Sequence, residues 1–533
     1  MTSADIDPVD HAHCRPEVAW TSGNVAEAFP GVCTPLGFTF MHAPVELALR
    51  SAFRDIGVFT AAQVRVPPGI EEQFWTVFAG RAAANMDQFR ALADITPGTS
   101  ATAVEQQLFG YVRPETVDHN SFRRYPAIFI KAPRVVATLG KTHDAYFAEL
   151  RRWRSASLSS VTAMDGGSCV QLLADARQRL RTIMRLHFLA TFVGNGLVDK
   201  LAATAAKQGE PGLEARLLSG VGSDENDVAG DLWELAHGRL GMTTFLDRHG
   251  YHGTNEGQLD SPSWREDPDL LKARLDDLRA MGVDSPRAPA RRTAAQQAEG
   301  LAAQERLAAS MSWLSRELFR RSVRMTARYV ALREQGKAGL LMTFDVARAA
   351  ARRLGALSVQ DGRLEEAGDA FFLTYDELTG GPPNGAADLV ATRRARHQER
   401  RNQRLPESWT GVPEPVRIAG PAGTTSTGIS IEGVGACSGV VEGRARVVTD
   451  PESTELDEGD LLVCEATDPG WISLFVVAGG VVTDLGGMLS HGAIVAREMG
   501  IPCVVGTRTA SRTIRDGQRI RIDGDQGVVA VLD

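Results

Sequence analysis

The sequence predicts a multidomain protein in which a largely α-helical region precedes a small α/β module. The length of 533 residues exceeds that of one ordinary domain. From about residue 44 to 400 the chain is rich in Ala, Leu, Arg and Glu at helical spacing, as in Ala174 to Phe192 and Leu301 to Glu334. Beyond residue 428, short Val- and Ile-rich runs alternate with Gly- and Asp-containing turns around one helix signal, which is typical of an α/β module.

Breaks in these patterns predict the boundaries. The helical region is interrupted by a polar, Gly-containing loop from Asp247 to Asp267 and by the Pro-containing stretch Gly282 to Arg292. Leu405 to Gly428 contains four prolines and several small residues, which is typical of an interdomain linker. We therefore expect an N-terminal tail over 1–18, a mainly helical domain over 19–404, a flexible linker over 405–428 and the module over 429–533.

The composition excludes several classes of protein. A net charge of −8 argues against a surface for nucleic acid or anionic membrane. No charged start followed by an apolar run is present, and we expect a cytoplasmic protein. Six scattered cysteines without a C-x-x-C pair predict reduced thiols. The run His11-Ala12-His13-Cys14 is more simply part of a mobile tail than a metal site, and no metal site is predicted.

The most informative segment lies in the module and predicts a histidine at a helix start. Val481 and Val482 end a predicted strand, and Gly486 and Gly487 permit a sharp turn. Ser490 is a suitable N-cap, residues 493–499 are helix formers, and the helix is expected to stop at residue 500, a glycine. His491 therefore falls in the first turn of a short helix.

That position suits phosphoryl chemistry. A neutral imidazole is a competent nucleophile near pH 7, and the phosphoramidate it forms can pass the group on. The helix N-terminus offers N–H donors and the positive end of the dipole to a phosphate. The same dipole should lower the imidazole pKa, which favours the neutral form. A lone histidine at a helix start more often only caps or packs, so the residues around His491 decide its interpretation.

Those residues follow a known pattern. The run from Gly486 to Gly506 matches G-G-x-x-S-H-x-A-I-x-A-R-E-x-G-I-P-x-V-V-G, and residues 435–443, 467–471 and 523–527 match its surroundings. The segment resembles the swivelling phosphohistidine domain of the PEP-utilising enzymes, such as phosphoenolpyruvate synthase, pyruvate phosphate dikinase and rifampicin phosphotransferase. The resemblance implies that His491 is phosphorylated and that Thr467, Ser490 and Arg497 lie near the phosphate.

The earlier region resembles the substrate-binding domain of rifampicin phosphotransferases. The matching runs are Trp20 to Pro30 with Thr34-Pro35-Leu36, Phe245 to Asp267, Arg333-Glu334 with Lys337, and Asp369 to Leu378. Such relatives usually begin with an ATP-grasp domain, and no Gly-rich phosphate loop followed by Lys replaces it here. ATP and Mg²⁺ are therefore expected on a separate ATP-grasp subunit. The family usually has Arg where this chain has His252.

This split layout is similar to that of phenylphosphate synthase and related alkylphenol-phosphorylating enzymes. We therefore expect a small phenolic acceptor, phenol or a 4-alkylphenol such as p-cresol, phosphorylated through His491 with release of AMP and phosphate. One alternative is a component of a rifamycin-type antibiotic phosphotransferase. Another is a non-enzymatic phosphocarrier or regulatory protein.

The acceptor side has weaker candidates. His252 and Glu256 lie in the polar loop and either could serve as a general base, while His249 could contact substrate or phosphate. The alternative is that His252 and Glu256 only hold the turns of their own loop. The glycines of the loop disfavour a metal site there. Phe38 belongs to an apolar entry that could line a pocket or form ordinary core, with the neighbours Phe29, Pro35, Leu36, Phe40 and Met41.

Overall fold

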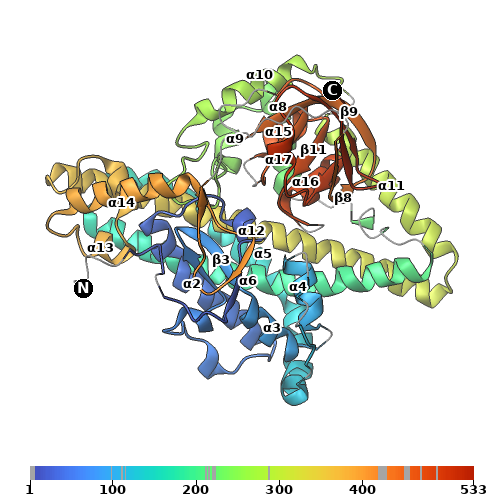
Figure 1. The fold of residues 1–533 in the computed structure, drawn as a ribbon, viewed down its shortest axis with the longest axis horizontal. Coiled ribbons are helices and arrows are strands. Elements are labelled where there is room, and N and C mark those ends of the chain that lie inside the picture. The colour runs from blue at the N-terminus through green and yellow to red at the C-terminus, as the bar shows by residue number, and fades with distance from the viewer. Residues whose placement is uncertain are drawn as a thin grey trace. The chain divides into compact units, whose positions relative to one another are not determined.

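The computed structural model describes residues 7–11, 13–23, 25–97, 99–109, 112–113, 116–119, 121–209, 213, 217–218, 224–285, 288–417, 429–448, 456–467, 471–487 and 490–532. The chain divides into two compact units. The first comprises Met1–Leu189, Asn255–Ser261 and Gly336–Ile418. The second comprises Ala190–Thr254, Pro262–Gln335 and Ala419–Asp533. Each unit is described by itself below (Figure 1).

The predicted fold class is confirmed: a large helical region precedes an α/β module. Local signals explain many helix starts. Thr34 caps α2, its Oγ1 accepting a hydrogen bond from the backbone N–H of Gly37 at 3.3 Å, and Pro35 occupies the first helical position. The helices before the module are α1 (Val25–Ala28), α2 (Pro35–Asp55), α3 (Met86–Asp94), α4 (Ala101–Phe109), α5 (Tyr125–Ser160), α6 (Gly166–Lys207), α8 (Asp224–Ala236), α9 (Met242–His249), α10 (Lys272–Ala280), α11 (Pro289–Ala309), α12 (Trp313–Gln360), α13 (Tyr375–Thr379) and α14 (Ala386–Arg401).

The helical region also contains a sheet that the sequence did not predict. Four strands pair antiparallel in the order β2 (Trp75–Phe78), β3 (Arg81–Asn85), β1 (Ala19–Thr21) and β5 (Ser408–Thr410). The strand β3 reads Arg-Ala-Ala-Ala-Asn, a composition that favours a helix. Its backbone groups are instead satisfied by two neighbouring strands, so tertiary pairing overrides local propensity.

This sheet corrects two expectations about the chain's organisation. Strand β5 lies inside the stretch predicted as linker, and it pairs with β1 near the N-terminus. The two short strands β4 (Gln403–Arg404) and β6 (Val416–Arg417) also pair with each other. Residues 405–417 are therefore folded into the first unit, and 418–428 lie outside the described residues. Part of the predicted tail is packed as well: Val9 is buried, and Asp10 forms an ion pair with Arg400 at 2.8 Å.

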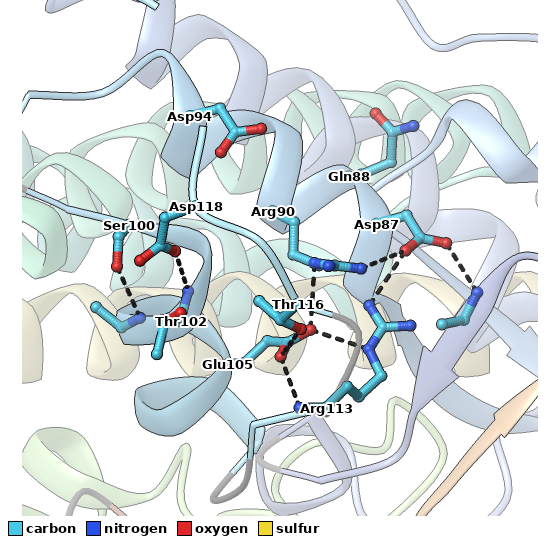
Figure 2. Close-up of polar contacts among 12 residues, drawn as sticks. Asp87, Gln88, Arg90, Asp94, Ser100, Thr102, Glu105, Arg113, Thr116 and Asp118 are labelled. Atoms are coloured by element: carbon cyan, nitrogen blue, oxygen red, sulfur yellow. Dashed lines mark hydrogen bonds and ion pairs between the residues drawn. The ribbon is translucent and has the colours of Figure 1, made fainter. Parts of the chain in front are cut away.

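The first unit holds a buried polar network beside its hydrophobic core (Figure 2). The Glu105 carboxylate in α4 is fully buried and is paired with Arg90 at 3.2 Å and Arg113 at 2.9 Å. It also accepts hydrogen bonds from the Arg113 backbone N–H at 3.0 Å and the Thr116 hydroxyl at 2.5 Å. Asp87 of α3 contacts both arginines as well. The network therefore joins α3, α4 and the chain that follows α4.

The helices of the second unit confirm one predicted break and add another. Helix α10 ends at Ala280 and α11 begins at Pro289, as the Pro-containing stretch predicts. The pattern from Leu301 to Glu334, in contrast, is not one helix. Helix α11 ends at Ala309 and α12 begins at Trp313. The turn brings apolar side chains of both helices, such as Leu307 and Phe319, into one small core.

The module is an α/β fold around an eight-stranded sheet, drawn in red in Figure 1. Strands β9 (Val440–Val448), β10 (Leu461–Cys464), β11 (Gly480–Thr483) and β12 (Cys503–Val505) are parallel neighbours. Antiparallel strands complete the sheet: β7 (Ser430–Glu432), β8 (Val434–Cys437), β13 (Arg519–Asp523) and β14 (Val528–Val531). The helices are α15 (Ile472–Val477), α16 (His491–Met499) and α17 (Ala510–Thr513). The Val- and Ile-rich runs beyond residue 428 coincide with β9 to β14; they are residues 444–448, 461–464, 480–482, 502–505, 520–522 and 528–532.

Two further expectations concern chemistry rather than topology. All six cysteines are free, as predicted, and four of them are buried. Within the described residues, no helix is both long and apolar enough to span a bilayer.

Glu105→Ala should destabilise the first unit by about 3 kcal/mol, because it leaves the Arg113 and Arg90 guanidinium groups without their buried carboxylate. Urea denaturation followed by circular dichroism measures the loss. Glu317→Ala is the control, since Glu317 pairs with Arg321 and Arg324 on the surface, and the urea midpoint should barely change. Equal losses of stability in the two variants would contradict the importance of burying the Glu105 carboxylate.

The same network should respond to acid. Burial tends to raise the pKa of Glu105, but hydrogen bonds from Thr116 and Arg113 outweigh it and hold the pKa below its usual value. A carboxylate with a lowered folded-state pKa stabilises the fold above its unfolded-state pKa. That stabilisation should therefore be present at neutral pH and be lost as the pH falls below about 4.5. In Glu105→Gln this part of the acid dependence should disappear from urea midpoints measured between pH 3 and pH 7.

Candidate functional site

The candidate site lies where three parallel strands of the module end. Thr467 follows β10, Asp484 follows β11, and Thr507 follows β12. Because these strands are parallel neighbours, their carboxyl ends meet at one edge of the sheet. All three side chains are buried. Ligands of open α/β sheets characteristically bind outside this edge, and the chain reaches helix α16 from it.

Helix α16 begins as the sequence predicts, with His491 at its first position. Ser490 has an extended backbone, and its Oγ accepts a hydrogen bond from the Ala493 N–H at 3.3 Å. The helix ends at Gly500, whose φ of +65° is the left-handed conformation that glycine tolerates. The start of a helix leaves backbone N–H groups without helical partners. His491 is thus placed on an element that can bind an anion.

Thr467 lies against the first turn of α16. A Cβ atom added at Gly492 would be 3.0 Å from the Thr467 Oγ1 and 3.4 Å from the Thr483 Cγ2. The absence of a side chain at Gly492 therefore allows the helix start to approach the end of β10 closely. The structure brings Thr467, Ser490 and the His491 backbone together at this edge. Their predicted role as phosphate neighbours stays a prediction.

A buried carboxylate that the sequence did not single out fixes the approach to α16. Asp484 accepts hydrogen bonds from the Thr507 hydroxyl at 3.0 Å, the Ser511 N–H at 3.0 Å and the Ser511 hydroxyl at 2.5 Å. Its own backbone bonds to Cys464 and Arg508. Two residues later, Gly486 has a φ of +105° and turns the chain. Asp484 thus holds the turn that leads to His491 against Thr507 after β12 and against Ser511 of α17.

Arg497 lies one and a half turns along α16 and is half-buried. Its Nε donates to the carbonyl of Ala493 at 2.9 Å, within the same helix. Arg497 also lowers the pKa of Cys437, which burial nevertheless raises to about 11. This thiol therefore stays protonated at neutral pH. The assignment of Arg497 to the phosphate remains a prediction from the family resemblance.

On the acceptor side, the second unit holds a paired histidine. His249 ends α9 and its Nε2 lies 2.9 Å from an Asp231 carboxylate oxygen that also accepts from Arg248 at 3.0 Å. Burial tends to raise the pKa of Asp231, but hydrogen bonds with His249 and Arg248 hold it below the usual value. Asp231 is thus an ionised partner that orients the imidazole. Sequence spacing gave no signal for it, because α8 and α9 meet only in the fold.

His252 is buried beside the same helix end. Its ring lies 4.4 Å from the ring of Tyr251, 5.4 Å from that of Trp264 and 6.4 Å from that of His249, measured between centroids. Its backbone carbonyl accepts from the Trp264 N–H at 2.7 Å. The two histidines of the polar loop therefore share one aromatic environment. Their predicted roles as base and substrate contact stay predictions.

The remaining candidates belong to the first unit. Glu256 is buried there, in the short segment Asn255–Ser261. Phe38 is also buried, in α2, with its ring 4.8 Å from His42 and 5.9 Å from Trp75. The rest of the apolar entry is core, since Leu36, Phe40 and Met41 are at most 1% exposed. Within the described residues, no group of three or more His, Cys, Asp or Glu is arranged to hold a metal ion.

Comparison with known proteins identifies the module. Residues 456–527 match the mobile domain of PEP-utilising enzymes. The C-terminal module is a PEP-utilising mobile domain. Residues 198–334 match the fourth domain of rifampicin phosphotransferase. The mobile-domain match lies within the second unit, and the fourth-domain match does so apart from residues 255–261.

Several curated proteins resemble the chain over part of their length. A rifampicin phosphotransferase of a Streptomyces species is 34% identical over 56% of this chain and 35% of that protein. A second, from Bacillus cereus, is 37% identical over 38% of this chain and 24% of that protein. An uncharacterised protein of Mycobacterium tuberculosis is 31% identical over 63% of this chain and 36% of that protein. The chain therefore matches about a third of the length of these relatives.

Asp484→Ala should weaken the start of α16, because three donors lose a buried, charged acceptor, at a cost of at least about 2 kcal/mol. We expect faster amide hydrogen exchange in residues 491–499 and slower phosphorylation of His491 by phosphoramidate, a small histidine-phosphorylating donor. Asp484→Asn should recover part of both. Asp457→Ala is the control, since Asp457 forms only exposed contacts with arginines in the same module. If Asp484→Ala showed the hydrogen-exchange rate and the His491 phosphorylation rate of the wild type, Asp484 would not hold the start of α16.

Proposed function

We propose that the chain is the acceptor-binding and phosphohistidine part of a dikinase-type phosphotransferase that acts on a hydroxyl of a rifamycin-like macrocycle. The observation that carries the proposal is the position of His491 at the start of α16, on the carboxyl edge of the sheet of a PEP-utilising mobile domain. The rifampicin phosphotransferase relatives and the fourth-domain match support the choice of acceptor.

The chemistry assigned to His491 is a two-step transfer. In the first step, a nitrogen of the neutral imidazole attacks the β-phosphorus of ATP, the bond between the β-phosphorus and the oxygen of the α-phosphate breaks, and AMP leaves with the electron pair. Water then cleaves the β–γ bond of the pyrophosphoryl group on the imidazole, which releases phosphate and leaves phosphohistidine. In the second, the acceptor oxygen attacks the phosphohistidine in line, the P–N bond breaks, and the electron pair returns to the imidazole. The hydroxyl proton leaves to a base. Water must be excluded during the second step, because hydrolysis would compete with transfer.

The phenolic acceptor that the split layout suggested has less support. The named relatives reported above are rifampicin phosphotransferases, and neither name refers to a phenol. The sequence alternative of an antibiotic phosphotransferase therefore takes precedence. A small phenol such as p-cresol remains useful as the competing acceptor in a direct test, because both compounds present a hydroxyl group beside an aromatic ring.

The aromatic side chains of the apolar entry are packed core in the first unit, and no role in acceptor binding is assigned to them. Phe29 stacks on Trp75 at 5.5 Å, Phe38 meets Trp75 edge-on, and His42 contacts both Phe38 and Trp75. Burial lowers the pKa of His42 to about 4, so it adds no charge at neutral pH. The Trp75 indole N–H is buried and has no partner within the described residues.

The base for the acceptor proton is assigned to the polar loop. A histidine held by a carboxylate is the usual arrangement for a general base near neutral pH, and His249 with Asp231 has that arrangement. His252 and Glu256 are the other candidates, as the sequence suggested. The assignment rests on chemistry and local geometry.

ATP and Mg²⁺ are assigned to a separate ATP-grasp partner, which would supply the activated phosphoryl group. Calorimetric titration of this chain alone with MgATP should show no binding in the micromolar range. A micromolar dissociation constant would contradict the partner assignment and leave the role of His491 unaffected.

The acceptor assignment has a direct two-stage test. The chain is first loaded with phosphoramidate, which needs no partner, and excess donor is removed. Rifampicin or p-cresol is then added, and loss of the phosphoryl group and formation of phosphorylated acceptor are followed by mass spectrometry. We expect rifampicin to discharge the protein at least tenfold faster than p-cresol, because the named relatives are rifampicin phosphotransferases.

His491→Ala is the control for loading, since alanine is well tolerated in a helix and leaves no nucleophile. It should give no phosphorylated acceptor at all. Faster discharge to p-cresol than to rifampicin would instead support a phenolic acceptor. Equal, slow hydrolysis with both compounds would exclude both acceptors and favour a phosphocarrier.

A further inference from the structure

The outer helices of the second unit and the phosphohistidine module share one buried core. From the helices it contains Trp233 of α8 and Leu275 and Leu278 of α10. From the module it contains Phe475 of α15 and Met499 of α16. The layer of α15 and α16 is therefore covered by the module's sheet on one side and by α8, α10 and α11 on the other. We call this face of α8, α10 and α11 the helical face.

Helix α11 contacts the end of α16 through a side-chain hydrogen bond. Gln296 Nε2 donates to the carbonyl of Arg497 at 2.9 Å. A Cβ atom at Gly500 would lie 3.1 Å from the same Nε2. The glycine that ends α16 therefore also leaves room for the Gln296 amide. Nearby, an Arg292 nitrogen lies 3.9 Å from the Met499 sulfur, a weaker contact.

Two features indicate that this contact can open. The other face of the module's sheet has a separate core, with members such as Ile520, Ile522 and Val529, so the sheet does not depend on the helices for all its packing. The Gln296 Oε1 is buried and lacks a hydrogen-bond partner within the described residues. A buried acceptor without a partner is unfavourable and is relieved when water reaches it.

The helical face also belongs to the acceptor side. Phe245 and Trp264 are members of the shared core. The same two rings flank the loop histidines: Phe245 lies 5.3 Å from His249, and Trp264 lies 5.4 Å from His252. Docking of the module and the placement of the loop histidines therefore depend on the same aromatic side chains.

We propose that the helical face is the acceptor-side docking station of the phosphohistidine module, and that Gln296 is the latch that holds the module there. The inference rests on the proposed function, because a histidine that serves a donor and an acceptor must occupy two positions in turn. In the docked position the module is held for discharge to the acceptor. Release of the latch frees the module for loading by the phosphoryl donor.

Gln296→Glu tests the latch, because a carboxylate cannot donate to the Arg497 carbonyl and is costly to bury. The matched control is Gln297→Glu, the same change at the exposed neighbour on the same helix. In the full chain we expect hydrogen exchange of residues 496–501 to rise at least fivefold in Gln296→Glu only. Phosphoramidate loading of His491 should stay within twofold of wild type, and discharge to rifampicin should slow at least fivefold.

Exchange in β13, whose buried side chains belong to the separate core, is the internal check and should not change. A rise there as well would mean a destabilised module and would overturn the latch. Wild-type exchange and discharge in Gln296→Glu would overturn it too. If wild type discharges to neither rifampicin nor p-cresol while exchange at residues 496–501 still rises in the variant, the docking station stands and the acceptor assignment fails.

Discussion

The helix start that carries His491 can bind an anion only if the turn before it holds its backbone N–H groups in place. The contacts that fix this turn lie at the carboxyl edge of the parallel strands. Asp484 accepts one hydrogen bond from Thr507 after β12 and two from Ser511 of α17, and Ser490 accepts one from α16. Gly486 supplies the positive φ of the turn, and Gly492 lets Thr467 approach the helix. The position of His491 therefore depends on a few buried polar contacts that lie before and beside it.

The same module is packed on both sides of its sheet. One face of its sheet has a separate core, while the α15–α16 layer shares a core with α8, α10 and α11. A domain with its own core can leave a partner surface without unfolding. The hydrogen bond from Gln296 to the carbonyl of Arg497 makes the contact specific. In the proposed mechanism, docking and release of the module depend on this contact.

Local signals explain what could be predicted from the sequence. Ser490, Gly500 and the glycine turn each act within a few residues, so the start and end of α16 follow from the sequence alone. Strand β3 was missed because its alanines favour a helix and only pairing with β1 and β2 makes it a strand. Strand β5 was assigned to a linker because its partner β1 is near the other end of the first unit's sequence.

The missed site residues have the same explanation. Asp484 meets Ser511, 27 residues away, and Asp231 meets His249, 18 residues away. Neither pairing has a short-range pattern, because the fold alone brings the partners together. Family resemblance located His491 and its immediate neighbours, while the carboxylates that hold the turn and orient the loop histidine required the structure.

The measurement that tests the account most directly is the location of the phosphoryl group. The chain contains 11 histidines, and each can in principle react with phosphoramidate. Peptide mass spectrometry at neutral to alkaline pH, which preserves phosphohistidine, gives the phosphorylation rate of each one. The account predicts that His491 is phosphorylated at least tenfold faster than any other histidine, because the helix start stabilises the incoming phosphoryl group. Comparable rates at His491 and at exposed histidines such as His13 would contradict it.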